Sequence, residues 1–106
     1  MAWLLLIFAG VLEVVWAYAM KLSHGFTRPQ ATVVTLVTML ASFGLLSVSM
    51  RTLPLGTAYT VWTGIGAAGA FALGILVLGE AVTLTRMVAA MLIMAGVVLM
   101  KLSEVP

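Results

Sequence analysis

Glu13 is the residue of this sequence whose position most strongly suggests chemistry. It stands in the run GVLEVVWAYAMK, and it is the only acidic or basic residue before Lys21. In a helix that begins at Ala2, at about 1.5 Å per residue, Glu13 lies about 17 Å along the axis. This depth is close to the middle of a hydrocarbon layer about 30 Å thick. A charge is costly there, and acids at such depths usually serve ion or proton pathways.

The helical neighbours of Glu13 favour a pocket around its carboxylate. Gly10 and Trp16 are three residues away and Ala17 is four residues away, so all of them share its face of the helix. Gly10 and Ala17 leave room, whereas Trp16 offers an indole N–H and an aromatic wall. The alternative is a protonated, structural glutamic acid that is hydrogen-bonded to a neighbouring helix. We favour the pocket.

Two further apolar stretches carry polar or aromatic groups at helical spacing. In the first, hydroxyl groups form one stripe at Thr35, Thr38, Ser42 and Ser49. Hydroxyls in helices often bond to their own backbone, so no single one of them indicates a site. In the second, Tyr59, Trp62 and Gly66 share a face. Gly64 and Gly66 bracket a β-branched residue and predict a hinge, since each glycine costs about 1 kcal/mol relative to alanine in a helix.

These residues must be positioned by membrane-spanning helices. The chain has 106 residues, of which 64% are hydrophobic and 8% charged, with a mean hydropathy of +1.27. Four stretches have the length of a transmembrane helix, about 2–20, 32–50, 57–78 and 87–100. Short links with Gly25, Pro29, Pro54 and Gly79 join them. We therefore predict an all-α integral membrane protein with a single transmembrane domain over residues 1–106, whose first stretch is a permanent helix.

The basic residues leave the orientation in the membrane open. Three of them flank one side (Lys21, Arg28 and Arg86) and two flank the other side (Arg51 and Lys101). Orientation follows the Lys/Arg bias of short loops, and this bias is small. Either one charge fixes a single orientation, or the chain inserts both ways (dual topology). A chain that inserts both ways can pair with an inverted copy of itself.

Composition argues against several classes of function. There is no cysteine, the single histidine (His24) lies in a link, and no acid–base pair lies within one stretch. We therefore expect no enzyme activity, no metal site and no cofactor. A net charge of +2 is too small to indicate nucleic-acid binding. Glu80 and Glu104 are expected to be charges at the membrane surface.

Three segments carry a resemblance to a known family. LEVVWAYAMKLSHGFTR, LPLGTAYTVWTGIG and GVVLMK resemble the small multidrug resistance family, in its guanidinium-exporter branch, and the likeness covers essentially the entire chain. The resemblance implies a proton-coupled exporter in the bacterial inner membrane that works as an antiparallel homodimer of four-helix subunits. It also implies that helices one to three form the transport chamber and that helix four forms most of the dimer contact.

The resemblance also implies roles for individual residues. The site would consist of an acid that binds substrate and protons, its hydrogen-bonding supports, an aromatic lining that acts as a gate, and a helix hinge. These are Glu13; Trp16 and Ser42; Tyr59 and Trp62; and Gly64 and Gly66. Lys101 matches a basic residue characteristic of this branch, although a lysine at a helix end also reaches the membrane surface without further function. Thr60, Pro29 and the spacing from Ala89 to Gly96 depart from the family pattern.

The chemistry of guanidinium suits these residues. It is planar and permanently charged, its N–H groups form paired hydrogen bonds with a carboxylate, and aromatic rings stabilise cations on their faces. The expected function is guanidinium/proton exchange around paired Glu13 residues, with alkylguanidines or small quaternary ammonium ions as additional substrates. The alternatives are a broader exporter of quaternary ammonium ions and, less favoured, a non-transporting membrane assembly subunit. A second, non-identical partner chain also remains open.

Overall fold

The chain folds into four long helices. A computed structural model describes residues 1–103, so Glu104 lies outside the described residues. The helices are α1 (Ala2–Leu22), α2 (Pro29–Ser49), α3 (Leu55–Leu76) and α4 (Leu84–Leu102). Each has 19 to 22 residues and is apolar enough to cross a membrane. The prediction of four apolar helices in an all-α protein is confirmed.

Most of the predicted helix ends differ from the structure by two or three residues. α2 begins at Pro29 and not near residue 32, because proline at the first helical position gives up an N–H that has no partner there and already has a helical φ. α4 begins at Leu84 and not near residue 87, because the Thr83 hydroxyl accepts a hydrogen bond from the Arg86 N–H at 3.1 Å and caps the helix. In the sequence alone, these residues look like parts of the links.

The other two helices also differ from prediction, since α3 is shifted by two residues and α1 is two residues longer. α3 begins at Leu55, directly after Pro54, and it ends at Leu76 and not at residue 78. α1 continues to Leu22, where the buried Ser23 hydroxyl donates to the Met20 carbonyl at 2.7 Å and ends the helix. The glycines of the two longer links, Gly25 and Gly79, have positive φ values of 71° and 70°. They form the turns that the sequence predicts.

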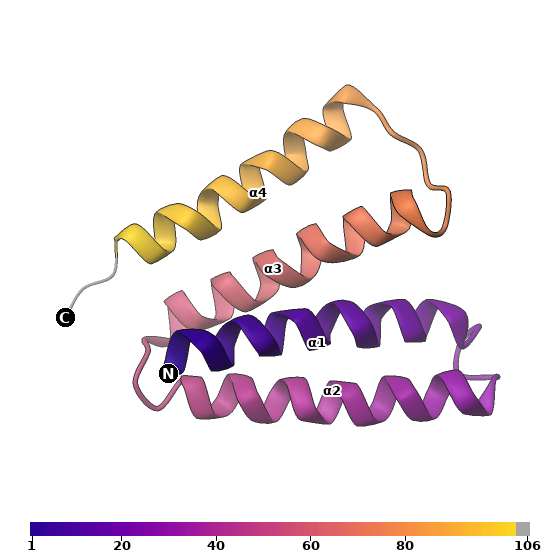
Figure 1. Cartoon of the computed structure of the whole chain (residues 1–106), viewed down its shortest axis with the longest axis horizontal. Helices are drawn as coiled ribbons and strands as arrows, with labels where there is room; N and C mark the ends of the chain where they lie inside the picture. The colour runs from indigo at the N-terminus through magenta and orange to yellow at the C-terminus, as the bar shows by residue number, and fades with distance from the viewer. Residues whose placement is uncertain (104–106) are drawn as a thin grey trace.

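Three helices make up the packed part of the molecule. α1 packs against α2 and α3, and α4 lies on the far side of α3, with its backbone close to α3 alone among the described helices (Figure 1). The core includes Leu6, Ala9, Leu46, Val61 and Trp62, where α1, α2 and α3 meet. No residue of α4 is buried. The core therefore holds α1, α2 and α3 in register, and α4 contributes little to it.

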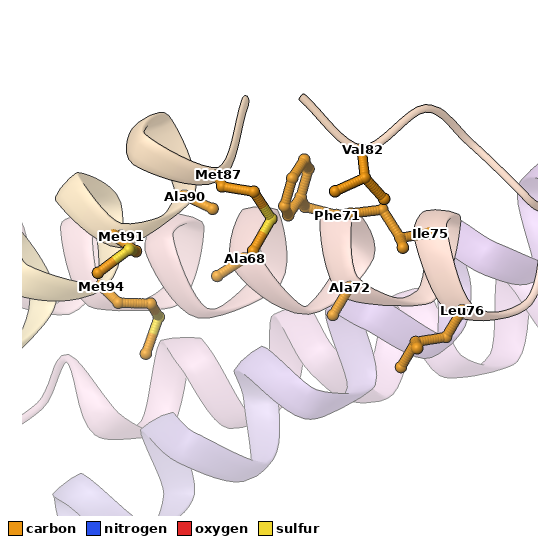
Figure 2. A pocket seen from close by; sticks show the side chains of 10 residues that line it. All are labelled: Ala68, Phe71, Ala72, Ile75, Leu76, Val82, Met87, Ala90, Met91 and Met94. Carbon is orange, nitrogen blue, oxygen red and sulfur yellow. The ribbon is translucent and has the colours of Figure 1, made fainter. Parts of the chain in front are cut away.

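The space between α3 and α4 contains an apolar groove of about 420 Å³. Figure 2 shows its lining, which includes Phe71 and Ile75 from α3 and Met87, Met91 and Met94 from α4. Its side chains are hydrocarbon and thioether groups. A second groove between the same helices, of about 540 Å³, lies nearer the start of α3 and includes Tyr59 and Thr63. These grooves show how loosely α4 is packed within one chain.

Candidate functional site

The side chain of Glu13 lies directly against α3. A Cβ atom built on Gly66 would overlap the Glu13 carboxylate and would lie 2.8 Å from its Cγ. Real Cβ atoms essentially never approach other heavy atoms closer than 3.0 Å. Glycine at position 66 is therefore what allows the carboxylate to reach the backbone of α3. Sequence reasoning missed this contact, which joins two helices that are far apart in the chain.

Gly10 and Gly64, near the site, are also in close contact with side chains of neighbouring helices. A Cβ on Gly10 would lie 2.6 Å from Ile65 Cγ2, and a Cβ on Gly64 would overlap Val97 of α4. The room beside Glu13 that Gly10 was expected to leave is thus occupied by Ile65 of α3. α3 runs as one helix through Gly64 and Gly66, so both glycines serve close helix contact in this structure. The hinge stays a prediction.

Ser42 connects the three core helices by hydrogen bonds. The Trp62 indole Nε1–H donates to Ser42 Oγ at 3.0 Å, and the Ser42 hydroxyl donates to the Ala9 carbonyl at 2.7 Å. Ser42 and Ala9 are fully buried. The Ser42 proton therefore goes to Ala9 and not to Glu13. The connection holds α2 and α3 against the turn of α1 that precedes Glu13.

The other hydroxyls of the α2 stripe behave differently. Thr35 donates to the Ala31 carbonyl at 2.8 Å and Thr38 donates to the Val34 carbonyl at 2.6 Å. Ser49 donates to the Leu46 carbonyl at 2.7 Å. All of these acceptors belong to α2 itself. Ser42 is thus the member of the stripe that bonds to another helix.

Four aromatic rings form a row that begins at Trp16, about one turn after Glu13 on the same face of α1. Phe43 stands between two tryptophans, with ring centroids 6.3 Å from Trp16 and 5.9 Å from Trp62, both in edge-to-face geometry. Tyr59 continues the row at 5.7 Å from Trp62. Phe43 was not among the predicted site residues, because one phenylalanine in an apolar stretch looks like a lipid-facing or core residue. Its position next to Ser42 was the available signal.

Two buried polar atoms of the site lack a protein partner. Glu13 Oε1 and Trp16 Nε1 have no hydrogen-bond partner among the described residues. Buried polar groups are almost always paired. One of these atoms is an acceptor and the other is a donor, and both come from the same face of α1. The site therefore offers a ligand one carboxylate oxygen and one indole N–H in apolar surroundings.

Lys101 lies against Trp3 and not among the residues of the candidate site. Its Nζ stands 4.5 Å from the centroid of the Trp3 ring, a cation–π geometry that ties the end of α4 to the start of α1. Among residues 1–103 there is no group of three or more His, Cys, Asp or Glu that could hold a metal ion. The acid, the supporting polar groups and the aromatic row are thus the parts of the chain that form a candidate transport site.

Comparisons with known proteins agree with this picture. The sequence profile described as Small Multidrug Resistance protein matches residues 1–93. A guanidinium exporter of Yersinia pseudotuberculosis is 52% identical over 104 residues, which cover 98% of this chain and all of that protein. Guanidinium exporters of Citrobacter freundii and Salmonella typhimurium are 52% identical over 103 residues, 97% of this chain and 98% of each relative. These are transporters, and the resemblance found in the sequence is confirmed. The chain is a multi-pass protein of the bacterial inner membrane, and it belongs to the small multidrug resistance family.

Proposed function

We propose that this protein exports guanidinium in exchange for protons, and that Glu13 binds both ions in turn. The observation that carries the proposal is the pair of buried, unpartnered atoms, Glu13 Oε1 and Trp16 Nε1. Acids in the middle of membrane helices are rare and usually mark substrate, ion or proton pathways. The names of the relatives supply the substrate, because they are guanidinium exporters at 52% identity.

The geometry of guanidinium fits the partners that the site offers. Its N–H groups form parallel hydrogen bonds with the two oxygens of a carboxylate, an arrangement that is stronger than neutral hydrogen bonds. Its flat faces suit the aromatic row of Trp16, Phe43, Trp62 and Tyr59. Tyr59 ends the row beside Trp62, and its 54% exposure in the single chain supports the proposed role as a gate.

Protons and guanidinium exclude each other at one carboxylate. A proton on Glu13 removes the negative charge that holds the cation, and a bound cation opposes protonation. If only loaded carriers change their facing side, this exclusion produces obligatory exchange. The two ions then move in opposite directions across the membrane without a further coupling device.

The working unit is proposed to be an antiparallel homodimer, with α1 to α3 as the chamber and α4 as the dimer contact. α4 contains no buried residue, and most of its apolar side chains are exposed. Those side chains suit burial against a second copy as well as contact with lipid. Two Glu13 carboxylates would then face one chamber. The Trp16 N–H would orient them toward the edges of the cation, and Ser42 would act indirectly, by holding Trp62 and the Ala9 carbonyl in place.

A broader exporter of quaternary ammonium ions is the second candidate. The row of aromatic rings favours it, since aromatic faces bind cations that have no N–H donors. Guanidinium is preferred here because Glu13 Oε1 is a buried acceptor without a partner, and a carboxylate acceptor serves a donor-rich cation. Alkylguanidines and small quaternary ions are proposed as weaker substrates.

Reconstituted protein tests the proposal. In liposomes loaded with a pH-sensitive dye, an imposed guanidinium gradient should drive proton movement in the opposite direction. Glu13→Gln protein, reconstituted at the same density, serves as the matched control and should give no signal. Guanidinium movement that is independent of the proton gradient would remove the exchange mechanism. No movement of either ion in the unmodified protein would remove the assigned transport.

A further inference from the structure

The guanidinium group of Arg86 has two partners that resemble those proposed for the substrate. Arg86 Nη2 lies 3.6 Å from Glu80 Oε1, and Arg86 Cζ lies 5.4 Å from the centroid of the Phe71 ring. A carboxylate stands at one edge of this guanidinium and an aromatic ring lies beside its face. None of these residues belongs to the Glu13 site.

The position of Glu80 is fixed by the end of α3. Its backbone N–H donates to the Gly74 carbonyl at 2.9 Å. A Cβ atom on Gly74 would overlap Glu80 Oε1 and would lie 2.8 Å from its Cδ. Glu80 therefore rests on Gly74 as Glu13 rests on Gly66. The two glycines are eight residues apart in α3, about 12 Å along the helix.

A groove extends from Glu80 between α1 and α3. It has a volume of about 310 Å³ and is lined by Ala17, Tyr18 and Lys21 of α1, by residues of α3 that include Gly74, and by Glu80. Ala17 is one helical turn after Glu13. Glu80 thus stands at the end of the groove near the membrane surface, and Ala17 marks its approach to the Glu13 site.

We propose that Glu80 and Phe71 form a second binding site for guanidinium-class cations, and that Arg86 occupies this site when no such cation is present. The side chains of Arg86 and Glu80 are 44% and 42% exposed, so ions from solution reach them. Exposed ion pairs contribute little free energy. A free guanidinium ion can therefore displace the arginine at a small cost in free energy. Lys21 in the same groove adds a positive charge that keeps the affinity low, with a Kd that is roughly millimolar. This second site is separate from the proposed transport site, because it includes no atom of Glu13.

Full-length protein with Glu13→Gln isolates the second site. In that background, guanidinium is titrated in the millimolar range at constant ionic strength, with binding followed by NMR signals of the α3–α4 link and by calorimetry. Arg86→Gln removes the tethered competitor and should tighten guanidinium binding by about tenfold. Adding Glu80→Gln should then weaken it by about one to two decades, the value of a hydrogen bond to a charged group.

Two controls keep the result specific. Arg28→Gln removes an equal charge at the same end of the molecule and should leave binding in the Glu13→Gln background unchanged. Tetramethylammonium, which has no N–H donors, should lose less affinity than guanidinium when Glu80→Gln is added, and an equal loss for both cations would contradict a guanidinium site. If Arg86→Gln leaves guanidinium binding as weak as before, or if binding survives Glu80→Gln, the second site does not exist. Failure of the proposed transport appears separately, in protein that retains Glu13.

Discussion

The carboxylate of Glu13 rests on the backbone of α3 at Gly66, in space that a single methyl group would fill. This contact fixes the register of α1 against α3 at the depth of the acid. It also places Glu13 one turn of α3 away from Trp62, the aromatic residue that is hydrogen-bonded to Ser42. Gly66, which contacts the acid, and Trp62 thus lie on the same face of α3.

Gly66→Ala tests the contact between the Glu13 carboxylate and α3. The added methyl group overlaps the carboxylate, so we expect guanidinium binding to weaken by about one to two decades, which corresponds to about 1–3 kcal/mol of overpacking. Gly56→Ala is the matched control, because a methyl group on that α3 glycine would meet no atom within 4 Å. Binding would be measured calorimetrically at one pH. Equal affinity in both variants would mean that the carboxylate does not need its place against α3.

Glu13→Gln tests the charge. The amide is isosteric with the acid but cannot be negatively charged, so both guanidinium binding and guanidinium-driven proton movement should be lost. The measurements are calorimetry in detergent and dye-reported proton flux in liposomes. Circular dichroism checks that the helices are intact. Proton-coupled transport that persists in this variant would contradict the role assigned to Glu13.

The pH dependence of binding follows from competition at Glu13. Guanidinium binds the deprotonated acid, so its apparent affinity should fall as the pH drops below the value at which Glu13 titrates. The slope should be about tenfold per pH unit for each proton released, and affinity should level off at higher pH. Titrations at a series of pH values measure the slope. An affinity that rises toward low pH would have the wrong sign for exchange.

Ser42→Ala separates the two transporter candidates. It removes the acceptor of the Trp62 N–H and the donor to the Ala9 carbonyl, and it should weaken guanidinium binding by about one to two decades. A small quaternary ammonium ion, which needs no ordered hydrogen bonds, should bind about as before. Thr38→Val is the control, since that hydroxyl bonds to the backbone of its own helix. If both cations lose affinity by the same factor, Ser42 does not select between them.

The balance of basic residues predicts insertion in both orientations. A reporter that is active on only one side of the membrane, fused to the carboxyl terminus, should show both populations. Two lysines added to the link at residues 51–56 should shift the population toward one side. Strictly one-sided insertion of the unmodified chain would exclude an antiparallel pair of identical subunits and would require a different, inverted partner.

The apolar stretches predicted the number and the type of the helices, because length and hydropathy decide what crosses a bilayer. They did not predict the helix ends at Pro29 and Leu84, which depend on one proline and on one capping hydroxyl. Depth in the membrane marked Glu13 as the central residue. Its contact with Gly66 depends on how far α1 is shifted along α3, and helix spacing within one segment contains no information about that shift.

The roles of the α2 hydroxyls and of Phe43 also could not be predicted from helix spacing within one segment. Thr35, Thr38 and Ser42 form one stripe in the sequence, but Ser42 alone of these three bonds to another helix. The difference comes from the close approach of α1 at Ala9, a residue that is fully buried. Phe43 was missed because its two tryptophan neighbours come from α1 and α3. Contacts between helices, and not the residue types, determine these roles.

The hydrogen bonds of Ser42 also decide which parts of the molecule move together. In an α-helix the N–H of Glu13 donates to the carbonyl of Ala9, the same carbonyl that accepts the Ser42 proton. Any displacement of Trp62 is therefore transmitted through Ser42 to the peptide that carries the acid. Among the described helices, α4 is the one that can swing without breaking this buried connection. The link of residues 77–83 therefore allows α4 to move relative to α1, α2 and α3, and these three helices move as one unit that carries Glu13.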